Sequence, residues 1–180
     1  MKRKVTVILA AVMIAVASFV TTTTSALAAS KTSVDAITFY SYQDNTPPGK
    51  EIAYPQIHKE AGGRGTYKDP ITVSVEASFL EPGTRLYVND LKKYLIVEDL
   101  CGNWPCGTHD TKNYIDVWMN SEEDSDPDAI DACQRKWTRR TKDGNEPKEI
   151  VISPREDLPV STTAFFDTNS DKCAKPPQNW

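Results

Sequence analysis

The stretch from Gly83 to Met119 places acidic residues inside apolar β-strand patterns, and this restricts the folds open to the chain. The run Tyr94–Val97 is apolar on both faces and is followed at once by Glu98 and Asp99. Asp116 stands inside a second apolar run. Asp and Glu are depleted from strands, because a pleated surface is half-buried. A strand that is apolar on both faces belongs at the centre of a sheet. The acids in these strands therefore need a specific structural or functional reason.

The first 28 residues have the three parts of a secretory signal peptide. Lys2–Lys4 is basic, Val5–Val20 is almost entirely apolar, and Ala26–Ala28 offers small residues for cleavage. The apolar run is short for a membrane span. We expect cleavage after Ala28, or alternatively after Ala29, and one folded domain in residues 29–180. The mature protein is expected to be secreted, with no membrane segment.

The net charge of the chain limits the classes of partner that it can bind. It has 25 Asp and Glu against 21 Lys and Arg, for a formal net charge of −4. Removal of the basic N-terminus makes the remaining domain more acidic. An acidic domain repels nucleic acid and anionic lipid, so neither is an expected partner. A polysaccharide is compatible with this charge, and we expect a monomer.

Four cysteines in an exported chain predict two disulfides, for which three connectivities are possible. We favour Cys101–Cys106, which closes a short loop, and Cys133–Cys173, which ties down the C-terminal tail. A zinc site is the alternative. The C-x4-C spacing, without a paired C-x2-C or H-x3-H, argues against it.

The hydrophobic pattern predicts about seven short strands, one helix and an irregular C-terminal tail. Ser125 is expected to cap the helix, which would start near Pro127. This pattern favours a small closed β-barrel with one packed helix. The expected strands are Ala36–Tyr42, Ile52–Tyr54, Ile71–Glu76, Arg85–Val88, Tyr94–Asp99, Tyr114–Met119 and Glu149–Ile152, with one helical turn at Gln56–Ala61 and the helix at Asp128–Trp137.

Strand alternation puts Tyr114, Asp116 and Trp118 on one face. An acid between two aromatic rings is typical of a sugar-binding cleft, in which the rings stack on sugar faces and the carboxyl reaches the glycosidic oxygen. Trp104 lies in the loop between the two strands and could line the same cleft. The alternative is that the rings belong to the core and that Asp116 pairs with a buried arginine such as Arg85.

Other site chemistries are weakly supported. The D-x-D-x-D pattern at 124–128 is similar to a calcium loop, but Ala129 stands where glycine is expected and Arg135 where the bidentate Glu is expected. His58 and His109 show no metal spacing, and we expect neither metal nor cofactor. Carboxylates remain, and a pair of them can cleave glycosidic bonds by acid/base chemistry.

Three segments resemble the double-psi β-barrel superfamily: P-G-T-R-L-Y-V (82–88), Y-L-I-V-E-D-L-C-G (94–102) and Y-I-D-V-W (114–118). The most similar members are secreted barwin-like and expansin-like proteins and the three-aspartate domain of bacterial cell-wall lytic enzymes. The three acids of that domain fall here on Glu76, Asp99 and Asp116, with Glu76 in place of an Asp. The resemblance covers about half of the chain.

The expansins and the more distant family-45 endoglucanases are similar in a further way. Tyr114–Asp116 resembles their His-Phe-Asp, and Thr38–Tyr40 followed by Asp44 resembles their Thr-x-Tyr and the Asp after it. The resemblance implies a six-stranded double-psi β-barrel with one packed helix. It also implies a protein that cleaves cell-wall glycan (peptidoglycan, chitin or β-glucan) as a lytic transglycosylase or endoglycosidase, or else a non-catalytic, expansin-like module that binds or loosens walls. The implied catalytic residues are Asp44, Glu76, Asp99 and Asp116, and the implied substrate-binding residues are Tyr40, Trp104, Tyr114 and Trp118.

Overall fold

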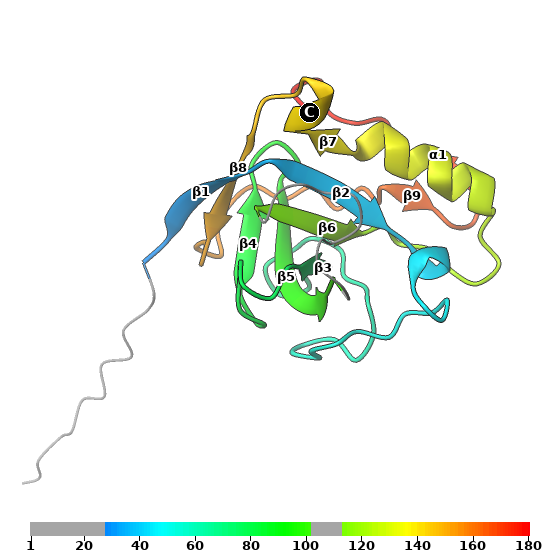
Figure 1. Cartoon of the computed structure of the whole chain (residues 1–180), viewed down its shortest axis with the longest axis horizontal. Helices are drawn as coiled ribbons and strands as arrows, with labels where there is room; N and C mark the ends of the chain where they lie inside the picture. Colours follow the sequence, from blue (N-terminus) through cyan, green and yellow to red (C-terminus); the bar gives the residue numbers. More distant parts are fainter. Residues whose placement is uncertain (1–27, 102–112) are drawn as a thin grey trace, which may run out of the picture.

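The computed structural model describes residues 28–101 and 113–180. The protein is mainly β with one α-helix, as predicted (Figure 1). Its elements are β1 (Ser30–Val34), β2 (Ala36–Tyr40), the 3-10 turn η1 (Tyr42–Asp44), β3 (Ile71–Val75), β4 (Arg85–Val88), β5 (Lys93–Leu100), β6 (Tyr114–Trp118), α1 (Pro127–Trp137), β7 (Arg139–Arg140), the 3-10 turn η2 (Thr141–Asp143), β8 (Lys148–Ile152), β9 (Phe166–Asp167) and β10 (Lys172–Cys173).

Eight strands form one curled, half-barrel sheet in the order β1-β8-β4-β5-β3-β6-β2-β7 (Figure 1). β5 lies in the interior of this order, which confirms the central position predicted for an apolar run. Two neighbouring pairs are parallel, β2 with β6 and β3 with β5, while β3 and β6 between them are antiparallel. Between the members of each parallel pair the chain runs through other strands of the same sheet: β4 lies between β3 and β5 in sequence, and β3, β4 and β5 lie between β2 and β6.

The core fills the inside of this curl. Every residue of β2 and of β3 is buried, because both strands are covered on both faces. Helix α1 lies along β2 in Figure 1 and buries Ile130, Cys133 and Trp137, which confirms the helical stripe. Phe165 from the C-terminal tail packs edge-on against Trp137 with the ring centroids 4.8 Å apart.

The C-terminal tail is fastened to the helix by the disulfide Cys133–Cys173, which confirms that predicted pair. Cys101 is also disulfide-bonded, but its predicted partner Cys106 lies outside the described residues. The tail is less irregular than predicted, because β9 and β10 pair as a short antiparallel ribbon.

Several local predictions are wrong at the element ends. The cap of α1 is Asp126, whose carboxylate accepts hydrogen bonds from the backbone of Asp128 and Ala129 at 2.9 and 3.1 Å. Ser125 instead accepts a hydrogen bond from the backbone N–H of Glu122. Because Pro127 favours the first helical position, the residue before it becomes the cap. The predicted strand 52–54 and helical turn 56–61 are absent, and residues 45–70 form neither strand nor helix.

The predicted signal peptide falls almost wholly on residues 1–27, outside the described part of the chain. Within residues 28–101 and 113–180, no helix has the length and apolar character needed to cross a membrane.

Candidate functional site

Four polar side chains form a row across adjacent strands of the sheet. In the strand registers, Thr38 of β2 pairs with Asp116 of β6, Asp116 pairs with Ser74 of β3, and Ser74 pairs with Asp99 of β5. Residues paired directly across neighbouring strands share one face of a sheet. The two acids are therefore two strands apart, or roughly 10 Å between their backbones.

A β-bulge decides which acid of β5 joins this row. The register of β3 with β5 shifts between Val73 and Ser74, so that Val73 pairs with Val97 and Ser74 pairs with Asp99. Glu98 is the extra residue. Bulges re-aim side chains in this way.

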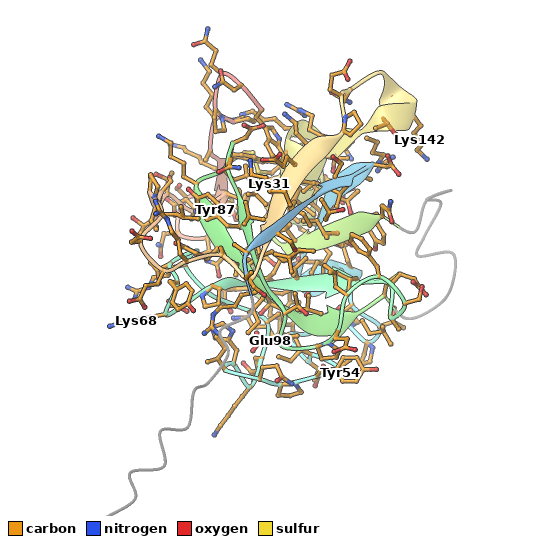
Figure 2. The ribbon with its side chains drawn as sticks, turned by 90° about the vertical axis from the view of Figure 1, so that its left-hand side faces the viewer. Lys31, Tyr54, Lys68, Tyr87, Glu98 and Lys142 are labelled. Carbon is orange, nitrogen blue, oxygen red and sulfur yellow. A yellow bond between two sulfur atoms is a disulfide. The ribbon has the colours of Figure 1, made fainter. Side chains whose placement is uncertain are left out.

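Glu98 points toward the loop segment 56–58 and is fully buried (0% exposed). Its Oε1 accepts backbone hydrogen bonds from Gln56, Ile57 and His58 at 3.2, 2.7 and 2.9 Å. Figure 2 shows Glu98 and Tyr54 in the same lower part of the molecule, where the backbone N–H of Tyr54 donates to the carbonyl of Glu98. Glu98 thus fastens this loop to the sheet.

Asp116 is the acid of the row that is best suited to proton transfer. Its Oδ1 accepts a hydrogen bond of 2.7 Å from the Thr38 hydroxyl. Burial raises the pKa of Asp116, the Thr38 hydrogen bond lowers it, and the charges of Asp44 and Asp99 raise it further, to about 7. A carboxyl with this pKa holds its proton near neutral pH and is available as a general acid.

Asp99 is held firmly by its neighbours. Its Oδ2 accepts from the Tyr40 hydroxyl at 2.9 Å, and its Oδ1 accepts from the backbone N–H groups of Ala53 and Leu100 at 3.1 and 2.8 Å. Burial raises the pKa of Tyr40 well above its usual value. The negative charge of Asp99 and its hydrogen bond with Tyr40 raise it further. Tyr40 is therefore a hydrogen-bond donor here, and Asp99 positions it.

Asp44 also accepts several hydrogen bonds, and it lies in η1, just beyond the same end of β2 that holds Tyr40. Its Oδ2 accepts from the backbone N–H and the hydroxyl of Ser41, both at 2.7 Å, and from Nε2 of Gln134 at 2.5 Å. This carboxylate closes the first turn of η1 and ties it to α1. Its charge also contributes to the raised pKa of Asp116.

Asp116 opens into a pocket of about 400 Å³ between β2, α1 and the β7–η2 turn. Thr38, Tyr40 and Asp44 line the same pocket. On the opposite side, α1, β7 and η2 contribute polar and charged side chains, and the charge of Arg140 partly offsets the rise in the pKa of Asp116. These side chains are Gln134, Arg135, Thr138, Arg140 and Asp143.

A comparison with known protein families matches residues 31–174 to the family described as "DDB_G0273701 N-terminal domain". This range holds every described residue of the site and the disulfide Cys133–Cys173. The chain belongs to this family.

A relative of the family is a Dictyostelium discoideum protein named "Uncharacterized protein DDB_G0273701/DDB_G0273221", which is 36% identical over 151 residues. The match covers 79% of this chain and 60% of the relative, so the chain spans about three-fifths of the length of that protein. No solved structure matches the chain.

One predicted site residue of this family member, Glu76, lies apart from the row. Glu76 accepts hydrogen bonds from the backbone and the hydroxyl of Ser78, and thus closes its own turn. Within the described residues, the side-chain hydrogen bonds of Glu76 go to Ser78 and not to Asp44, Asp99 or Asp116. Trp104 lies outside the described residues.

The predicted stacking rings are enclosed. Tyr114 and Trp118 are 2% and 1% exposed, and Trp118 packs edge-on against Tyr40 with centroids 5.2 Å apart. Tyr40 is also buried. Neither the face of Tyr114 nor that of Trp118 is open to solvent, and stacking on them stays a prediction. The alternative pairing of Asp116 with Arg85 is wrong, because the Arg85 guanidinium lies over the ring of Tyr67 at 4.8 Å.

Sequence reasoning missed Ser74 and His58. Nδ1 of His58 lies 2.6 Å from Glu98, and its Nε2 lies 3.1 Å from Asp69. The sequence signal that could have pointed to the His58 cluster was Glu98, an acid in an otherwise apolar strand. In the described part of the chain, no group of three or more His, Cys, Asp or Glu side chains is arranged to hold a metal ion.

Proposed function

We propose that this chain is a secreted protein that acts on cell-wall polysaccharide, with Asp116 as its general acid. The observation that carries the proposal is a carboxyl with a pKa of about 7 that opens into a pocket beside Thr38 and Tyr40. Cleavage of a glycosidic bond requires such an acid to protonate the leaving oxygen. The disulfide Cys133–Cys173 supports an extracellular location.

The hydrogen bonds that the other two acids, Asp44 and Asp99, accept from the protein favour a mechanism with one catalytic carboxyl. An inverting hydrolase needs a second carboxylate that is free to activate water. Asp44 and Asp99 each already accept three hydrogen bonds from protein donors. A lytic transglycosylase needs only one acid/base, because a hydroxyl of the sugar itself takes the place of water. We therefore favour this reaction, with Thr38 orienting Asp116 and with Asp99 positioning Tyr40.

The strand pairing supports a double-psi β-barrel as the finer description of the fold. Two parallel pairs, β2/β6 and β3/β5, meet at the antiparallel pair β3/β6. These pairings place Asp116 of β6 and Asp99 of β5 on the two strands that flank β3, in the same polar row. The resemblance in sequence, roughly Ile37 to Trp118, includes these four strands and β4.

A non-catalytic module that binds or loosens cell walls is the second candidate. The three hydrogen bonds that Asp44 and Asp99 each accept also favour it, since a binding protein needs no free base. In this case the pocket at Asp116 would hold sugar hydroxyl groups without breaking a bond.

Product analysis separates the two candidates. Purified protein is incubated with peptidoglycan, chitin or β-glucan, and soluble products are examined by mass spectrometry. We expect anhydro-sugar ends from the wild type, and a rate lower by roughly 10²- to 10⁴-fold in Asp116→Asn. Asp124→Asn, at an exposed position on the α1 side, is the matched control and should be as active as the wild type.

Two other results would change the assignment. Reducing ends that have gained water would indicate hydrolysis and would overturn the one-carboxyl mechanism. If wild type and Asp116→Asn give equally blank traces while both sediment with the wall polymer, the enzyme proposal fails and the binding module is favoured.

A further inference from the structure

Lys93 is a buried cation at the start of β5, far from the polar row. Its side chain is 3% exposed, and its Nζ donates to the backbone carbonyl of Ser161 at 2.8 Å. The same Nζ lies 5.1 Å from the ring centroid of Phe165. Within residues 28–101 and 113–180, no carboxylate forms an ion pair with Lys93. Lysine is almost never buried without a counter-charge, so this ammonium group lacks an anion.

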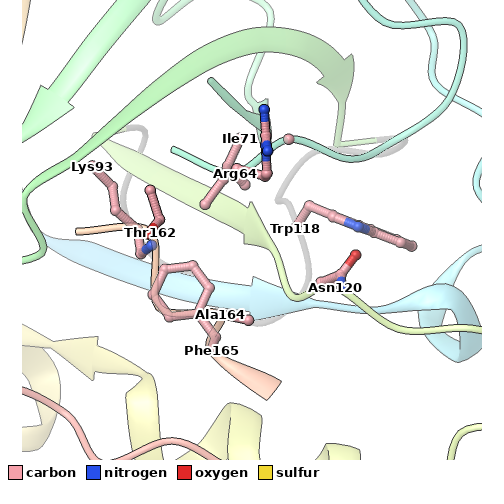
Figure 3. A pocket seen from close by; sticks show the side chains of 9 residues that line it. Arg64, Ile71, Lys93, Trp118, Asn120, Thr162, Ala164 and Phe165 are labelled. Atoms are coloured by element: carbon pink, nitrogen blue, oxygen red, sulfur yellow. The ribbon is translucent and has the colours of Figure 1, made fainter. Parts of the chain in front are cut away.

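A pocket of about 180 Å³ adjoins this ammonium group (Figure 3). Ile71 of β3 and Phe165 of the tail give it apolar walls, while Arg64 and Asn120 add polar groups. No acidic side chain is among the described residues that line it. An apolar cavity of about 150 Å³ holds a benzene molecule. The pocket is therefore large enough for a small ring or a branched chain.

We propose that this pocket binds a small organic anion, which is a monocarboxylate with an apolar body. The carboxylate pairs with the Lys93 ammonium group, and the body packs against Ile71 and Phe165. The Asn120 amide offers a further hydrogen-bond donor. Arg64 already has a partner, because its Nε lies 2.8 Å from Asp69 and its side chain is largely exposed. Lys93 is thus the cation of this pocket that needs a carboxylate.

This pocket is separate from the Asp116 pocket. The two share no lining residue. Lys93 and Asp99 stand at opposite ends of β5, or roughly 20 Å apart along the strand. Binding at Lys93 therefore does not depend on any activity at Asp116.

The protonation of Lys93 gives a readout that needs no variant. Burial lowers the pKa of Lys93 to about 8. A carboxylate bound beside the ammonium group favours its charged form, so ligand must raise this pKa. The full chain is titrated with benzoate while the Lys93 side chain is followed by NMR. An unchanged or lowered pKa would overturn the proposal.

Calorimetry tests the pairing directly. We expect the full chain to bind benzoate and to bind the neutral, equally sized benzamide at least about tenfold more weakly. Lys93→Met, which keeps the length of the side chain, should lose benzoate affinity by a similar factor. The control Lys31→Met, at an exposed position, should bind as the wild type does. No binding of benzoate to the wild type, or equal binding to Lys93→Met, contradicts the proposal.

Discussion

At the scale of single residues, Thr38 lowers the proton affinity of Asp116, which burial raises. The two side chains lie on paired positions of parallel strands, and the Thr38 hydroxyl donates to Oδ1 of Asp116. A hydrogen bond to a carboxylate stabilises its charged form and so lowers its pKa. This bond opposes the burial that raises the pKa of Asp116.

Replacing Thr38 with Val should raise the pKa of Asp116 above about 7, since the hydroxyl donor is lost while the shape is kept. NMR of the carboxyl carbon of Asp116 as a function of pH measures the midpoint. Thr32→Val on the edge strand β1 is the matched control and should leave it unchanged. A lower midpoint in Thr38→Val would show that the hydroxyl acts in another way.

His58 binds a carboxylate at each ring nitrogen, so its charged form is favoured. Burial lowers the pKa of His58, but the hydrogen bonds and charges of Glu98 and Asp69 raise it more, to above 6.5 overall. Burial raises the pKa of Glu98, and hydrogen bonds from His58 and Ile57 outweigh this and lower it. Burial also raises the pKa of Asp69, and hydrogen bonds from Arg64 and His58 outweigh this and lower it.

This cluster should stabilise the fold most between about pH 4.5 and 6.5. The His58 contribution is complete below pH 6.5 and is lost as the pH rises through its higher folded pKa. The contributions of Glu98 and Asp69 are present above their ordinary values of 4.5 and 3.8 and are lost as the pH falls. We expect His58→Gln to lose about 1–3 kcal/mol of unfolding free energy at pH 5.5.

Urea denaturation of wild type and His58→Gln at pH 5.5 and at pH 8.5 checks this dependence. The difference between the two proteins should be smaller at pH 8.5, where the wild-type imidazole loses its extra proton. A difference that is equal at both pH values would mean that packing, rather than charge, sets the contribution of His58.

At the scale of elements, the local patterns predicted most strands and the helix. Arg85–Val88 was placed correctly to the residue, and the apolar run before Glu98 was correctly placed inside the sheet. Strand β1 was missed because its sequence SKTSV lacks alternation, and pairing with β8 at the sheet edge is what makes it a strand. The bulge at Glu98 could not be predicted, because it depends on the register against β3.

The cap of α1 gives an element-scale prediction. Asp126→Ala should lower the free energy of unfolding by about 1 kcal/mol, because two backbone N–H groups at the helix start lose their acceptor. Chemical denaturation measures the change. Asp124→Ala removes an exposed acid of the same charge just outside the helix and should have less effect. Equal losses in both variants would attribute the effect to charge alone.

At the scale of the whole molecule, the C-terminal tail completes the core. Phe165 and Phe166 are buried, and the disulfide at Cys173 fixes the tail to α1. The tail also supplies the Ser161 carbonyl that holds Lys93. Residues without a periodic pattern therefore contribute both core packing and one wall of a pocket.

Removal of this disulfide should destabilise the whole molecule. The bridge joins residues 40 positions apart, and a loop of this length corresponds to about 4 kcal/mol of unfolding free energy. We expect this loss in the double variant Cys133→Ala/Cys173→Ala, measured by urea denaturation. Alanine is preferred to serine, because Cys133 is fully buried. A loss below about 1 kcal/mol would show that packing alone holds the tail.

The sequence by itself determined the properties that depend on near neighbours: the strand and helix segments, the central place of Tyr94–Val97, and the presence of Asp99 and Asp116 in strands. It also indicated the pair Cys133–Cys173. Only the tertiary structure decided that Thr38 and Ser74 flank Asp116, that Asp99 rather than Glu98 joins their row, and that Lys93 lines a pocket without an acidic side chain among its described residues. These facts depend on register between strands distant in sequence, and a shift of one residue reverses which side chains share a face.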